Sequence, residues 1–96
     1  MNVAVTGLNL FLVEWYGPKA KTDFIAKTAG QLNDSTTATS AGGAQIRLLM
    51  ALAVPADDYA FGVFAAESAE TVAQVCAAAS APAGRISAAV GWPQCG

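Results

Sequence analysis

The chain has 96 residues, of which 54% are hydrophobic and 12% are charged, and its net charge is −2. A chain of this length suits one domain with a single hydrophobic core. The negative net charge argues against nucleic acid and anionic membranes as partners, because both bind clustered cationic side chains.

Segments that would direct the protein to a membrane or out of the cell are not expected. The longest apolar run, Leu48–Ala56, has about half the length that a membrane helix needs. No basic segment precedes the N-terminal hydrophobic stretch, as it would in a signal peptide. Cys76 and Cys95 are too few for a disulfide framework and form no Cys-x-x-Cys pair. We therefore expect a cytoplasmic protein with reduced thiols, no membrane association and no nucleic-acid partner.

The first strand is expected from Leu8 to Tyr16, after an N-terminal extension over residues 1–7. It is rich in leucine, aromatic and β-branched side chains, and Gly17-Pro18 ends it. Both of its alternating faces are largely apolar, which predicts a central strand in a sheet with both faces covered.

A helix is expected from Lys21 or Thr22 to about Ser40. Its apolar stripe has the i, i+4, i+8 spacing and consists of Phe24, Thr28 and Leu32, with Ile25 and Ala29 beside them. The second half, residues 33–39, is rich in Asn, Asp, Ser and Thr, whose side chains compete for backbone hydrogen bonds. We therefore expect this half to be irregular.

Two further strands are expected to form a hairpin, Ala44–Val54 and Tyr59–Ala66, around a turn at Pro55–Asp58. Alternation would put Ile46, Leu48, Met50, Leu52 and Val54 on one face of the first of these strands, and Arg47, Leu49, Ala51 and Ala53 on the other.

Ser68 has the residue type and position of a helix N-cap. The helix that follows would turn Val72, Val75, Cys76 and Ala79 inward, which makes Cys76 a small buried hydrophobe. Pro82 and Gly84 end it, Arg85–Val90 forms a fourth strand, and residues 92–96 form a tail in which Cys95 is exposed. The order of elements predicts an α+β, ferredoxin-like βαββαβ sandwich over residues 8–91, with a four-stranded antiparallel sheet and two helices on one face.

The helices of such a fold leave one sheet face uncovered. If Phe64 and Leu12 face the helices, the uncovered face carries Phe11, Val13, Trp15, Tyr59, Phe61 and Val63. Burying each of these side chains would contribute roughly 1.5–3 kcal/mol, so we expect a partner to cover them. A second subunit is the simplest partner, and a small apolar ligand between or under the sheets is compatible with it. RNA is disfavoured, because Asp57-Asp58 stands where an RNA-binding strand of this kind would carry a cation.

Glu14 is the candidate catalytic or binding carboxylate, because it lies among apolar neighbours near the end of a central strand. It could instead pair with Arg47 or Arg85. Glu14, Tyr16 and Arg47 together could form a polar pocket, in which the tyrosine would orient a ligand. Arg47 alone could also serve as a charge that blocks sheet addition at an edge. The sequence has no histidine, which rules out Ser-His-Asp catalysis.

Several short motifs, in this order and spacing, resemble a family of small bacterial ferredoxin-like proteins. They are residues 11–14 with Tyr16-Gly17-Pro18, Val54–Asp57, Phe61 with Phe64, Ser68–Glu70 with Val72, and Arg85-Ile86. The family is classed as a domain of unknown function, is often labelled nickel-binding, and is related to dimeric α/β-barrel proteins. The resemblance implies a homodimer. It also raises the possibility of nickel, but without histidine or spaced thiolates we expect no metal site and no cofactor here.

Two functions follow as hypotheses. The first is a small homodimeric binding protein without catalytic activity. The alternative is a cofactor-independent enzyme of the dimeric α/β-barrel kind, a monooxygenase or isomerase acting on an apolar small molecule. In that enzyme Glu14 would be the base, and Tyr16 or Trp15 would shape the pocket. An enclosed cavity of roughly 300 Å³ or more with Glu14 pointing into it would favour the enzyme.

Overall fold

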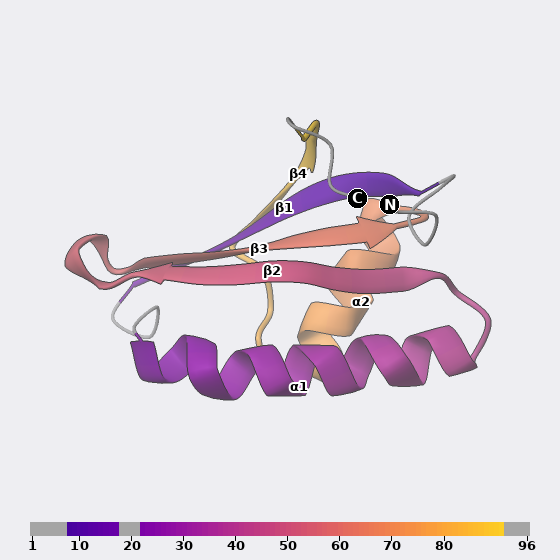
Figure 1. Cartoon of the computed structure of the whole chain (residues 1–96), viewed down its shortest axis with the longest axis horizontal. Helices are drawn as coiled ribbons and strands as arrows, with labels where there is room; N and C mark the ends of the chain where they lie inside the picture. The colour runs from indigo at the N-terminus through magenta and orange to yellow at the C-terminus, as the bar shows by residue number, and fades with distance from the viewer. Residues whose placement is uncertain (1–7, 18–21, 92–96) are drawn as a thin grey trace.

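A computed structural model describes residues 8–17 and 22–91 of the chain. It contains four strands and two α-helices in the expected order: β1 (Asn9–Tyr16), α1 (Thr22–Ala41), β2 (Ile46–Val54), β3 (Tyr59–Ala66), α2 (Ala69–Ala78) and β4 (Arg85–Ala89). The strands form one antiparallel sheet in the order β2-β3-β1-β4, and both helices lie on the same side of it (Figure 1). The predicted ferredoxin-like α+β sandwich, with β1 and β3 in the centre, is confirmed. The expected extension over residues 1–7 and the tail with Cys95 lie outside the described residues.

Helix α1 continues through its polar second half to Ala41, so the expected irregularity there is wrong. The hydroxyl groups of Thr36 and Thr37 both donate to the Asn33 carbonyl oxygen, at 2.8 and 3.0 Å, and so bond within the helix. Ser35 Oγ donates to the Val75 carbonyl oxygen of α2 at 3.0 Å. Thr36 is buried and extends the stripe formed by Thr28 and Leu32. Packing against α2 and β2 therefore overrides the weak helix propensity of this segment.

Helix α2 begins as the sequence indicates. The Ser68 hydroxyl accepts a hydrogen bond from the Thr71 amide at 3.2 Å, and Glu70 lies in the first turn. Its inward residues are the predicted ones, Val72, Val75, Cys76 and Ala79, all buried. They pack with Leu32 of α1 and Phe64 of β3 in one hydrophobic core. Burial raises the pKa of the Cys76 thiol to about 11, which keeps it protonated at neutral pH.

The register of the central strands corrects the expected faces of β1. Phe11 lies directly opposite Phe64, and Trp15 lies opposite Ala60. Residues directly opposite each other in an antiparallel pair share a face, so the alternating residues of β1 that face the helices are Phe11, Val13 and Trp15. Their exposed fractions are 8%, 0% and 5%, and they belong to the core. Their expected membership of the uncovered face is wrong, and Leu12 lies on that face instead.

Strand β2 contains a bulge that the alternation of its residues did not reveal. Leu48 pairs with Phe64 and Met50 pairs with Val63, so Leu49 is an extra residue between two consecutive partners of β3. Ile46 and Leu48 therefore face the helices, whereas the bulge turns Met50, Leu52 and Val54 to the uncovered side. The prediction that all five share one face is wrong.

Candidate functional site

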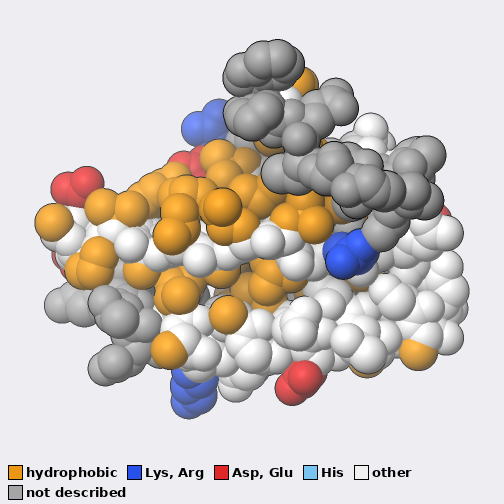
Figure 2. All heavy atoms as spheres, in the orientation of Figure 1, with side chains coloured by type: hydrophobic (Ala, Val, Ile, Leu, Met, Phe, Trp, Pro, Cys, Tyr) orange, Lys and Arg blue, Asp and Glu red, His pale blue; other side chains and the backbone are white. Residues whose placement is uncertain are grey.

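The sheet surface that faces away from both helices is the candidate site, and we call it the open face. Cross-strand pairs define its members: Leu12 with Val63, Glu14 with Phe61, Tyr16 with Tyr59, and Glu14 with Arg85 on the other side of β1. Strand β2 completes the open face with the partners of Val63, Phe61 and Tyr59, which are Met50, Leu52 and Val54. In Figure 2 hydrophobic side chains gather in a continuous band over the strands.

The open face is both apolar and accessible. Tyr16 is 55% exposed, Met50 50% and Leu52 46%, while Leu12, Tyr59, Phe61 and Val63 are half-buried. Of the six residues predicted for this surface, Tyr59, Phe61 and Val63 lie on it. Leu12, Met50 and Leu52 were missed, because only the cross-strand register could have placed them.

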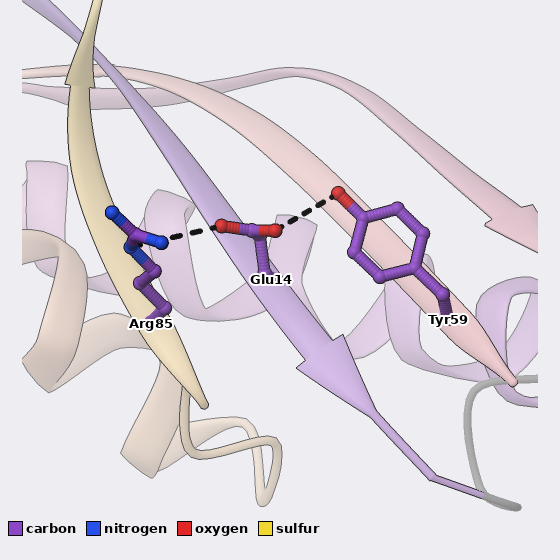
Figure 3. A network of polar contacts seen from close by, with 3 residues as sticks. All are labelled: Glu14, Tyr59 and Arg85. Atoms are coloured by element: carbon purple, nitrogen blue, oxygen red, sulfur yellow. Dashed lines mark hydrogen bonds and ion pairs between the residues drawn. The ribbon is translucent and has the colours of Figure 1, made fainter.

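Glu14 lies near the end of β1 among these apolar side chains. Its carboxylate lies between Tyr59 and Arg85, one on each neighbouring strand (Figure 3). The Tyr59 hydroxyl donates to Glu14 Oε1 at 3.1 Å. On the other side, Arg85 Nε is 4.0 Å from Glu14 Oε2, the side chain of Arg85 is 68% exposed and that of Glu14 is 16% exposed. The pairing with Arg85 was one of the two ion pairs that the sequence left open.

Aromatic rings line one side of the carboxylate. The ring centroids of Tyr16 and Tyr59 are 5.8 Å apart, and those of Tyr59 and Phe61 are also 5.8 Å apart, both pairs tilted. Desolvation first, and then the nearby Glu14 carboxylate, raise the pKa of both Tyr59 and Tyr16 above their usual value. Both phenols therefore stay neutral at physiological pH and can donate hydrogen bonds.

Two glycines allow aromatic rings to lie close to the backbone at this end of the sheet. A Cβ atom on Gly84 would stand 2.9 Å from Tyr16 Cδ2, and the Gly84 amide donates to the Glu14 carbonyl oxygen at 2.8 Å. On the helix side, a Cβ atom on Gly62 would stand 3.2 Å from Trp15 Cη2. The Trp15 indole Nε1 donates to the Ala81 carbonyl oxygen at 2.9 Å, which fixes its position.

Arg47 does not join Glu14 and Tyr16 in a polar pocket. It pairs with Ala65 on β3, four residues along the strand from Phe61, the partner of Glu14. Arg47 instead lines an open, hydroxyl-rich hollow of about 300 Å³ between the second half of α1 and the start of β2, together with Asn33, Thr36, Thr37, Ser40, Ile46 and Leu48. Glu14 does not line this hollow. The hollow is therefore not the cavity that would favour the enzyme, and the enzyme hypothesis stays a prediction.

The described part of the chain contains neither a cluster of metal ligands nor a membrane-spanning helix. No three or more Cys, Asp, Glu or His side chains gather there as a metal site requires. No helix of that part has the length and hydrophobicity to cross a membrane.

Comparison with known proteins supports the fold. No protein-family profile matches the sequence, and no curated protein matches it. The crystal structure of SCO4226 from Streptomyces coelicolor A3(2) is similar, with a TM-score of 0.66 at 19% sequence identity over 91% of this chain and 99% of that one. At this identity the likeness shows a shared fold and carries no function across.

Proposed function

We propose that this protein is a homodimeric binding protein without a bound metal, in which the open faces of two subunits pack together and hold a small apolar ligand between them. The observation that carries the proposal is the composition of the open face. Antiparallel sheets with one face in water normally place polar residues there. Here the strands expose leucine, methionine, valine and aromatic side chains instead.

The free energy available from covering this face supports a partner. Full burial of one such side chain contributes roughly 1.5–3 kcal/mol, and several of them lie together. Contiguous apolar patches of this kind on soluble proteins mark interaction sites or lead to aggregation.

The charges of the open face suit a second copy of the same chain. Among the described residues its charged side chains are Glu14 and Arg85, which are within 4.0 Å of one another, and the exposed Arg47, whose partner Ala65 alternates with Val63 and Phe61 on this face. A two-fold contact brings the same surface of each subunit together, so the acidic side chain of one copy can face the basic side chains of the other.

Sedimentation velocity of the purified protein at micromolar concentration tests the proposal, and native mass spectrometry of the same sample reports any ligand that co-purifies. We expect a two-chain species. Phe61→Asp and Leu52→Asp each place a carboxylate in the contact, and desolvation of that charge should weaken the dimer by on the order of tenfold or more.

Ala73→Asp is the matched control, because Ala73 is exposed on α2, away from the open face. It should leave the dimer intact. A single-chain species for the unmutated protein would overturn the proposal. The same holds if both open-face variants dimerise as strongly as the control.

A further inference from the structure

Glu14 is the single acidic residue in the four described strands, and it lies on the open face among apolar and aromatic side chains. Its side chain is only 16% exposed. A carboxylate can accept about four hydrogen bonds. The Tyr59 hydroxyl donates to it at 3.1 Å, the Tyr16 hydroxyl is a second hydrogen-bonding neighbour, and Arg85 forms an ion pair with it at 4.0 Å. These neighbours leave part of its capacity to accept hydrogen bonds open to a further donor.

The ion pair with Arg85 compensates this charge only weakly. The Arg85 side chain is 68% exposed and the contact is long, and exposed pairs of this kind contribute little because solvent screens them. When a second subunit covers the open face, Glu14 loses water. A carboxylate in such an environment needs a closer cationic partner.

The surroundings of the carboxylate define what that partner can be. The rings of Tyr16, Tyr59 and Phe61 follow one another beside it at centroid distances of 5.8 Å. Aromatic faces attract cations, and this attraction strengthens as water is excluded. Leu12 and Val63, which pair with each other on the same face, offer an apolar surface for the rest of a ligand.

We infer that the open face binds an organic cation, an amine or quaternary ammonium group on an apolar or aromatic body, with Glu14 as its counter-ion. The cationic group lies between the Glu14 carboxylate and the aromatic rings, and the apolar body lies along the leucine and valine side chains. An anionic ligand would meet the negative charge of Glu14. This inference rests on the proposed function and specifies the ligand class of the same site.

Calorimetric titration with phenethylammonium and with phenylpropionate tests the inference, because the two probes share a phenylethyl body and differ in the sign of their charge. We expect the unmutated protein to bind the cation on the order of tenfold more tightly than the anion. Glu14→Gln should abolish this preference. Glu70→Gln removes an exposed carboxylate on α2 and should leave it unchanged.

A second variant separates recognition of the cation from a merely structural role of Glu14. Arg85→Gln removes the internal competitor for the carboxylate, so it should tighten binding of phenethylammonium several-fold. Equal affinity for the two probes, or a charge preference that persists in Glu14→Gln, would overturn the inference. So would weaker cation binding by Arg85→Gln with its circular dichroism unchanged.

Sedimentation of the same samples distinguishes failure of the inference from failure of the proposed function. A dimer without preference for the cation contradicts the ligand class alone. A single-chain species contradicts the homodimer, and Glu14-dependent cation binding by that species would still support the ligand class.

Discussion

The side chains on the two faces of β1 contact different parts of the molecule. Trp15 faces the helices, lies against Gly62 and is fixed by its hydrogen bond to the Ala81 carbonyl oxygen. Its neighbours Glu14 and Tyr16 face the other way, and their side chains meet Tyr59. Adjacent positions in the sequence therefore serve the core and the candidate site in turn.

The close contact at Gly62 gives a prediction about stability. In Gly62→Ala the new methyl group would stand 3.2 Å from the indole of Trp15, whose hydrogen bond to the Ala81 carbonyl oxygen opposes the shift that the contact requires. We expect the free energy of unfolding to fall by about 1–2 kcal/mol, measured by urea denaturation.

Gly30→Ala is the control for this substitution. Gly30 lies in α1 with nothing within 4 Å of the new methyl group, so alanine should stabilise the protein by about 0.5–1 kcal/mol. Equal effects of the two alanine substitutions would show that the Trp15 contact does not constrain Gly62.

The two tyrosines give a prediction about pH. They are the only tyrosines in the sequence, so tyrosinate absorbance reports on this site alone. Because the folded-state pKa of both is raised above the usual 10.0, their contribution to stability is fully present below pH 10.0. It is lost as the pH rises from there through the folded-state pKa.

Spectroscopic titration should thus find both midpoints above the usual value in the folded protein. Glu14→Gln removes the carboxylate that favours both protonated phenols, so it should lower both midpoints, while the shift caused by desolvation remains. Midpoints that do not respond to this variant would contradict the geometry in Figure 3.

At the scale of elements, the sequence predicts the kind and order of the four strands and two α-helices in the described residues, because turn residues and caps separate them clearly. It did not predict the faces of β1 and β2. Both alternating sets of β1 are apolar, so only its pairing with β3 decides which set is buried. The bulge at Leu49 lies in a run of apolar residues, so the extra residue does not interrupt any alternation of polar and apolar side chains. Glu14 and its aromatic neighbours Tyr16, Tyr59 and Phe61 were all named from the sequence, but only the register shows that they lie together.

The bulge gives a prediction about deletions in β2. Deleting Leu49 removes the extra residue, and Leu48 and Met50 keep their partners Phe64 and Val63. The protein should fold with a free energy of unfolding within about 1 kcal/mol of the original, because the pairs on both sides survive.

Deleting Ala51 instead should be more harmful. Without Ala51 the bulge closes, and Met50 takes the place of Ala51 opposite Gly62. Its side chain then faces the helices. Overpacking against Trp15 should then lower the free energy of unfolding by about 1–3 kcal/mol. Denaturation followed by Trp fluorescence compares the two deletions, and a Leu49 deletion as damaging as the Ala51 deletion would contradict the assigned bulge.

At the scale of the whole molecule, the two helices supply a core for one face of the sheet only. That core is closed by Leu32, Val72, Val75 and Cys76 over β1 and β3, all fully buried. Among the described residues, apolar side chains of the other face such as Met50 and Leu52 remain exposed. The proposed dimer and the proposed cation site both follow from this one-sided architecture.

The strict alternation of β1 and β3 has a consequence for how such a protein can evolve. Positions that hold the fold together and positions that contact a partner are interleaved along the same strands, but their side chains never share a face. Mutations at Leu12, Glu14, Tyr16 and Phe61 can accumulate without loosening the core. The fold can thus change the partner that it binds without losing stability. We expect the sequence to diverge fastest on the open face, which contacts the partner.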